Sequence, residues 1–120
     1  MTPKPETNST PPLSLDELQA QVERWIMEIG GGYYSVLTNG LLLVEEVGEL
    51  ARLLARHYGD QSFKAGEDSS PQALADEFAD ILFVLACLAN QTGVNLTQAF
   101  YDKLARKNVR LRPKPAKDSS

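Results

Sequence analysis

The chain has few of the residues that build covalent cross-links or transition-metal sites. Its 120 residues include one cysteine, Cys87, and one histidine, His57. A single cysteine excludes an intrachain disulfide and a cysteine-cluster metal site, and it favours a reducing, cytoplasmic setting. A di-iron carboxylate bundle needs Glu-x-x-His pairs. His57 lies in no such pair, so that type of site is excluded as well.

Long hydrophobic segments and an excess of positive charge are also absent. The longest apolar run covers residues 81–89, whereas a membrane-spanning helix needs about 20 residues. The polar, proline-rich first residues are not followed by the apolar segment of a signal peptide. Sixteen acidic residues against 12 Lys and Arg give a net charge of −4. This balance argues against broad binding to nucleic acid polymers or to an anionic membrane.

The spacing of apolar residues predicts an all-α fold, with four helices in one bundle. We expect the helices to cover about 14–30, 34–58, 71–91 and 95–110. Ser14 is a typical N-cap, and Pro71 suits the first position of a helix. No segment alternates between apolar and polar residues for long enough to predict a strand.

The ends of the chain differ from its middle. Residues 1–12 and 113–120 lack apolar periodicity, and we expect disordered tails there around a single domain at 13–112. Seven of the 12 basic residues follow position 102, whereas six acidic residues gather in two groups in the middle of the chain. This separation of charge suggests two complementary parts of a site.

Two pairs of carboxylates are the most informative feature of the sequence. Glu46 and Glu49 lie three residues apart on the second expected helix, and Glu77 and Asp80 have the same spacing on the third. Residues at this spacing share a helix face. If the two helices pack antiparallel across their apolar stripes, the four carboxylates meet and need a hard cation, that is magnesium, manganese or calcium. The alternative is a solvated acidic face on each helix.

Basic and aromatic residues are candidates for contacts with a phosphorylated ligand. Lys103, Lys107 and Arg110 share one face of the fourth expected helix, and such a face suits phosphate oxygens. The alternative is a cation-rich helix C-terminus that the helix dipole favours. Trp25 is a candidate for stacking on a nucleobase, with packing in the core or an interface as the alternative. No P-loop motif is present.

The run LVEEVGELARLL, followed after a loop by LADEFADILFVLACLANQTGVNLTQAFYDKLARKN, resembles the MazG-type nucleotide pyrophosphohydrolases, especially the small single-domain members. The resemblance covers residues 33–112. It implies an all-α enzyme that assembles as a homodimer or homotetramer, with a pocket shared between subunits. It also implies magnesium-dependent hydrolysis of nucleoside triphosphates at the α–β bond, and a role in house-cleaning of nucleotide pools.

The resemblance also assigns roles to the acidic residues. Glu46, Glu49, Glu77 and Asp80 would be the ligands of magnesium, which manganese could replace. Glu45 is similar to the extra acid of the family's first motif. Glu45 or Glu46 would accept the proton of the attacking water.

The phosphate contacts and two other functions stay open. Family members often carry a Lys followed four residues later by an Asn near the end of the fourth helix. Here Lys103 is followed by Lys107 at that spacing and by Asn108 one residue later. A non-catalytic helical dimer that binds a nucleotide or a protein is the alternative function, and a phosphatase that releases orthophosphate is a third.

Overall fold

The computed structural model describes residues 10–59, 62–63, 66 and 70–111, and this part of the chain forms four helices and no strand. The helices are α1 (Leu15–Glu28), α2 (Val36–Tyr58), α3 (Pro71–Thr92) and α4 (Leu96–Leu111). The all-α prediction is therefore confirmed, and every boundary lies within two residues of its expected place. The tails expected at 1–12 and 113–120 lie outside the described residues, apart from 10–12.

Side-chain caps determine where the helices begin. The Ser14 hydroxyl accepts a hydrogen bond from the Glu17 N–H, and the Glu17 carboxylate accepts one from the Ser14 N–H, which completes a capping box. Ser70 caps α3 ahead of Pro71, whose ring is preorganised for a first helical turn. The α3 helix ends at Gly93 with φ of +74°, a left-handed conformation that glycine adopts without steric cost.

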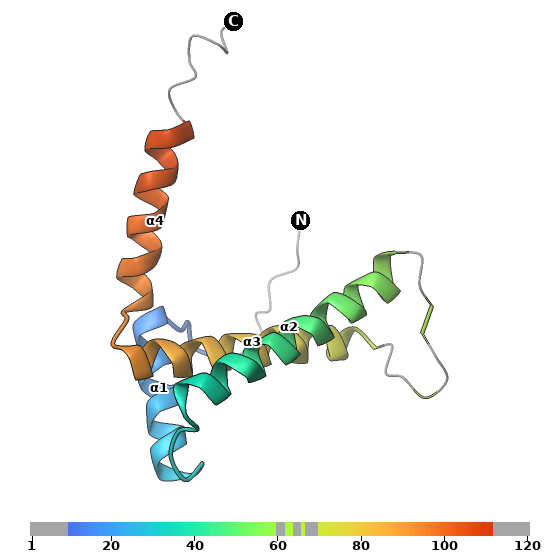
Figure 1. The fold of residues 1–120 in the computed structure, drawn as a ribbon, viewed down its shortest axis with the longest axis horizontal. Coiled ribbons are helices and arrows are strands. Elements are labelled where there is room, and N and C mark those ends of the chain that lie inside the picture. The colour runs from blue at the N-terminus through green and yellow to red at the C-terminus, as the bar shows by residue number, and fades with distance from the viewer. Residues whose placement is uncertain (1–9, 60–61, 64–65, 67–69, 112–120) are drawn as a thin grey trace, which may run out of the picture.

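The α2 and α3 helices lie side by side as an antiparallel hairpin, and α1 packs against α3 (Figure 1). The core lies between α1 and α3, where Val22 and Ile26 meet Ala86 and Cys87. Leu18, Tyr33 and Phe83 are partly buried against these residues. This core therefore holds the end of the hairpin at which α2 begins and α3 ends.

Two amide side chains connect α1 to α3 and to the segment that leads into α4. The Gln19 amide donates to Asn90 Oδ1 at 3.0 Å and to the Val94 carbonyl at 2.9 Å, and its oxygen accepts from the Leu96 N–H at 2.9 Å. Asn90 donates to the Gln19 carbonyl at 2.9 Å and to the Tyr33 hydroxyl at 3.1 Å. These bonds fix the direction in which α4 leaves the hairpin.

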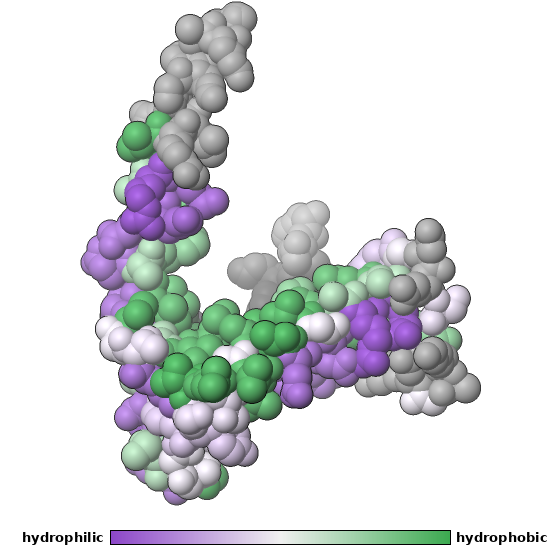
Figure 2. Space-filling view, viewed as in Figure 1, coloured by the Kyte–Doolittle hydropathy of each residue, from purple (hydrophilic) through white to green (hydrophobic). Residues whose placement is uncertain are grey.

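The α4 helix extends away from the other helices and contacts mainly α1 (Figure 1). The turn at Gly93 directs α4 outward. Within one chain the four helices therefore do not close into a compact bundle. Large apolar side chains stay exposed on α4, such as Phe100 at 58%, and on α2, such as Leu41 at 61% and Val44 at 68%. Figure 2 shows apolar side chains gathered over α2 and the lower part of α4. No helix of the described segments is long and apolar enough to span a membrane.

Candidate active site

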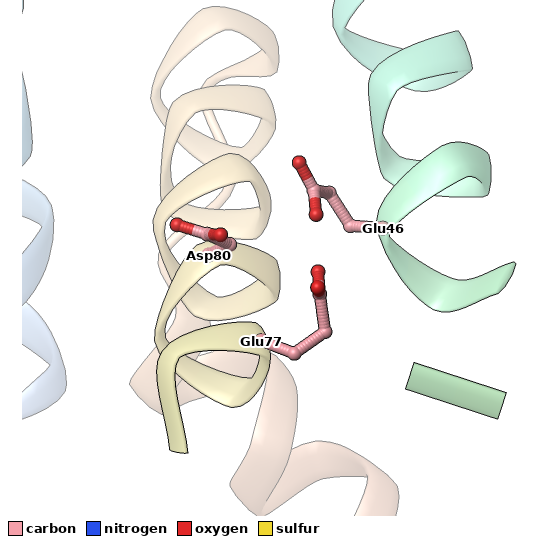
Figure 3. A group of neighbouring side chains, drawn as sticks. All are labelled: Glu46, Glu77 and Asp80. Atoms are coloured by element: carbon pink, nitrogen blue, oxygen red, sulfur yellow. The ribbon is translucent and has the colours of Figure 1, made fainter. Parts of the chain in front are cut away.

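Three acidic side chains converge between α2 and α3. Glu46 of α2 points towards α3, which carries Glu77 and Asp80 (Figure 3). One carboxylate oxygen of each residue lies within 4.8 Å of the others. The antiparallel hairpin thus brings together one acid of the first motif and both acids of the second. A set of donors made only of oxygen suits magnesium or manganese better than zinc.

Glu77 is the buried member of this group, with 9% of its surface exposed. Burial, with a smaller contribution from a hydrogen bond to Glu46 and from the charges of Glu46, Asp80 and Glu49, raises the pKa of Glu77 to about 7. Loss of hydration and the charges of Glu46 and Asp76 also raise the pKa of Asp80. Glu77 Oε2 is buried and has no hydrogen-bond partner in the described part of the chain. A cation at this position would remove the cost of that unpaired oxygen, so the residues present fit a hard divalent ion.

Glu49 does not belong to the converging group. It lies one turn along α2 from Glu46, where its carboxylate pairs with the guanidinium of Arg52. Its charge still contributes to the raised pKa of Glu77, so Glu49 lies within electrostatic range of the acids. A hollow of about 500 Å³ opens beside α2, which we call the outer hollow. It is lined by Glu45, Glu46, Gly48, Glu49 and Arg52.

A second hollow, of about 360 Å³, lies between α2 and α3 on the side of the connecting segment, and we call it the loop-side hollow. It is lined by Glu49, Arg52, Leu53, Phe63, Ala73, Asp76 and Glu77. His57 holds Phe63 in an edge-to-face contact with ring centroids 4.9 Å apart. The sequence analysis missed Arg52. The available signal was its position three residues after Glu49, which places it on the acid-bearing side of α2.

A third hollow, of about 450 Å³, lies towards the other end of the hairpin, and we call it the tryptophan hollow. The Trp25 and Phe83 rings meet edge to face in its wall, with centroids 5.7 Å apart. A Cβ atom at Gly30 would lie 2.9 Å from the Trp25 ring, so a larger residue at this position would force the ring to shift. Tyr33, Tyr34, Asn39, Leu42, Val84 and Cys87 also line the hollow. Its aromatic wall suits a flat ligand.

The basic residues of α4 lie away from the acids. Lys103, Lys107 and Asn108 are exposed on α4, and Arg110 belongs to the same helix, although its side chain is outside the described set. The α4 helix follows the far end of α3 from Glu77 and points outward (Figure 1). The structure therefore does not bring the expected phosphate contacts to the acidic group within one chain.

Comparison with known proteins places this fold among the all-α nucleotide hydrolases. The family model of the MazG nucleotide pyrophosphohydrolase domain matches residues 34–114. The chain therefore belongs to the MazG nucleotide pyrophosphohydrolase family, and it is a hydrolase that acts on pyrophosphate bonds.

Individual relatives agree with this assignment. The chain is 39% identical over 94 residues to the uncharacterized protein YpjD of Bacillus subtilis (strain 168), covering 78% of this chain and 82% of YpjD. The crystal structure of YpjD matches with a TM-score of 0.68 at 38% identity, over 82% of this chain and 97% of that one. The crystal structure of the Bacillus-conserved MazG protein, a nucleotide pyrophosphohydrolase, matches with a TM-score of 0.67 at 28% identity, over 82% and 94% of the two chains.

Proposed function

We propose that the protein is a magnesium-dependent pyrophosphohydrolase of nucleoside triphosphates. It would cleave the α–β bond, release a nucleoside monophosphate and pyrophosphate, and remove unwanted nucleotides from the cytoplasmic pool. The observation that carries this proposal is the convergence of Glu46, Glu77 and Asp80 from two helices. Family membership supports the reaction class, and the acidic group supports a metal-assisted form of it.

The acidic group is the proposed metal site. Glu46, Glu77 and Asp80 would bind magnesium or manganese directly, and Glu49 would join them once its carboxylate leaves Arg52. Magnesium held by carboxylates keeps positions for water and substrate phosphates. When bound, it would neutralise phosphate charge and lower the pKa of a coordinated water.

Glu45 is the proposed proton acceptor. Glu46 belongs to the converging group, whereas Glu45 lies on the neighbouring face of α2 and lines the outer hollow. Because Glu45 is not one of the proposed metal ligands, its carboxylate would be free to accept a proton from the attacking water. Glu46 is the alternative base if one of its oxygens is not bound to the ion.

The tryptophan hollow is the proposed site for the nucleoside. Leu42 and Val84 line this hollow and lie one helical turn from Glu46 and Asp80, respectively, so the two sites are about 6 Å apart along the helix axes. Trp25 is 46% exposed and would offer an aromatic surface to the base. The nucleoside and the reacting phosphate would thus lie along one hairpin.

A second copy of the chain is the proposed source of the basic side chains. The exposed apolar residues of α2 and α4 need a partner surface, and obligate homodimer interfaces are apolar in this way. The protruding α4 could then place Lys103, Lys107, Asn108 and Arg110 beside the acids of its partner. We propose a homodimer, or a homotetramer built from two such dimers, with sites shared between subunits.

The reaction is tested with a panel of nucleoside triphosphates, with and without magnesium, by measuring pyrophosphate and orthophosphate separately. We expect pyrophosphate release that EDTA abolishes. Glu46→Gln and Asp80→Asn should each lower the rate by about 100-fold or more, with helicity unchanged by circular dichroism. Glu28→Gln, which removes a charge at the end of α1 from a residue that belongs neither to the acidic group nor to the lining of the hollows, is the matched control. Direct release of orthophosphate, or full activity of Asp80→Asn, would overturn the proposal.

The shared site is tested by mixing two inactive variants. Glu46→Gln lacks a metal ligand, and Lys103→Ala with Lys107→Ala lacks the basic face. If the site is shared, half of the randomly mixed dimers are heterodimers with one intact site each, so co-expression should recover about a quarter of the wild-type activity. No recovery would mean that α4 serves its own chain. Full activity of the variant with Lys103→Ala and Lys107→Ala on its own would mean that α4 does not contact the substrate.

A further inference from the structure

Arg52 lies beside the acidic group and belongs to neither part of the site proposed above. It is the one basic side chain of the described residues that lines the outer hollow or the loop-side hollow, and it lines both. About 45% of the side chain is exposed, so it is open to a ligand entering either hollow. The basic residues of α4 lie on the outward-pointing helix (Figure 1).

The order of the hollows along the hairpin gives the substrate a direction. The tryptophan hollow lies on one side of Glu46 and Asp80, towards the start of α2. The loop-side hollow lies on the other side, and Glu77 belongs both to its lining and to the acidic group. A nucleotide with its base at Trp25 and its α-phosphate at the acids would extend its β- and γ-phosphates towards Arg52.

Arg52 could exchange its carboxylate partner, Glu49, for a phosphate of the substrate. In this structure its guanidinium pairs with the Glu49 carboxylate. A divalent ion at the acidic group would attract the same carboxylate, and the guanidinium would then lose that partner beside the loop-side hollow. Arginine presents a planar fork of donors that matches two oxygens of a phosphate.

We propose that Arg52 binds the β- and γ-phosphates of the substrate, and therefore the pyrophosphate product, from within the same chain. This inference rests on the proposed function, since it takes the hydrolysed bond to lie between the α- and β-phosphates. It assigns Arg52 to substrate binding. It also gives the Glu49 carboxylate two alternative partners, the Arg52 guanidinium and a bound divalent ion.

The test measures binding of two products to the full-length chain in saturating magnesium. We expect Arg52→Gln to raise the Kd of pyrophosphate by roughly 10- to 100-fold, the loss expected for a hydrogen-bonded charge pair. The Kd of the nucleoside monophosphate should stay within about twofold, because that product carries no β-phosphate. Arg52→Lys should give an intermediate loss, since it keeps the charge and lacks the planar fork. Arg24→Gln on α1, which makes the same change of charge outside the hollows, is the matched control.

Metal affinity without nucleotide separates a lost phosphate contact from a damaged site. Arg52→Gln removes the guanidinium that neutralises Glu49. This variant should therefore bind Mn²⁺ as tightly as wild type or more tightly. Pyrophosphate binding and Mn²⁺ binding that weaken by the same factor would overturn the assignment, since Arg52 would then only maintain the structure.

Two results of the product-binding measurements would contradict the role of Arg52 as a phosphate ligand, and release of orthophosphate would contradict only the proposed reaction. An unchanged Kd for pyrophosphate in Arg52→Gln refutes the role of Arg52 and leaves the proposed function standing. An equal loss of both products also refutes it. If the wild-type chain releases orthophosphate instead, the proposed function fails, and binding of pyrophosphate still decides whether Arg52 is a phosphate ligand.

Discussion

Replacing Glu77 with glutamine should stabilise the metal-free protein at alkaline pH. Burial and three neighbouring carboxylates raise the pKa of Glu77 from 4.5 to about 7. The folded chain therefore holds a proton that the unfolded chain releases, and stability is lost as the pH rises from 4.5 through about 7. A glutamine side chain cannot ionise, so the Glu77→Gln variant should lose this pH dependence.

The size of the effect follows from the same pKa. Ionising a group at pH 8 with a pKa of about 7 instead of 4.5 costs up to about 3 kcal/mol. Asp80 and Glu49 are exposed to water, which screens their repulsion of Glu77. We therefore expect Glu77→Gln to be about 1–2 kcal/mol more stable than wild type at pH 8. The two proteins should be nearly equal at pH 4.5.

The measurement is urea unfolding followed by circular dichroism in EDTA, at a fixed protein concentration, between pH 4.5 and pH 8. Magnesium should stabilise the wild type at pH 8 and have little effect on Glu77→Gln, because binding to the folded state requires the carboxylate. Glu28→Gln is the control and should keep the wild-type slope. A wild-type stability that rises over this range, or a Glu77→Gln variant less stable than wild type at pH 8, would refute the reasoning.

Three further substitutions test the fold, each by urea unfolding. Ile26→Ala should cost about 2–3 kcal/mol, because it leaves a cavity in the contact between α1 and α3; a loss below about 0.5 kcal/mol would contradict the assigned core. Gly93→Ala should cost about 1–2 kcal/mol, since the backbone there is left-handed, and an unchanged midpoint would argue against that turn. Asn90→Ala removes bonds to Gln19 and Tyr33 and should cost about 1–3 kcal/mol, so a neutral result would mean that the network forms no net stabilising contact.

Local sequence signals predicted the helices accurately because the caps lie in the sequence. The Ser14 N-cap and the helix start at Pro71 both occur where they were expected. The direction of α4 was not predictable in this way. It depends on the bonds of Gln19 to Asn90 and Leu96, which join positions more than 70 residues apart.

The acidic part of the site was predictable because its geometry is nearly local. Two helices with matching stripes pack antiparallel, and this brings Glu46 to Glu77 and Asp80. The place of Glu49 was not predictable from spacing, since a neighbouring arginine competes for its carboxylate. The sequence did not predict the tryptophan hollow either, because its wall combines residues of α1, the glycines at 30–32, α2 and α3.

The core and the acidic group occupy opposite halves of the α2–α3 hairpin, and this separation lets the fold tolerate repulsion between the acids. Ala86 and Cys87 lie in the half that α1 covers, whereas Glu77 lies in the half that ends at the connecting segment. In the described part of that segment, the Ser62 carbonyl accepts a hydrogen bond from Arg56 Nε at 3.2 Å. Because the buried core cluster lies in the other half, a cation that binds at the acids should stabilise this half more than it stabilises the core half. Ligand binding and local order are therefore coupled at the same end of the hairpin.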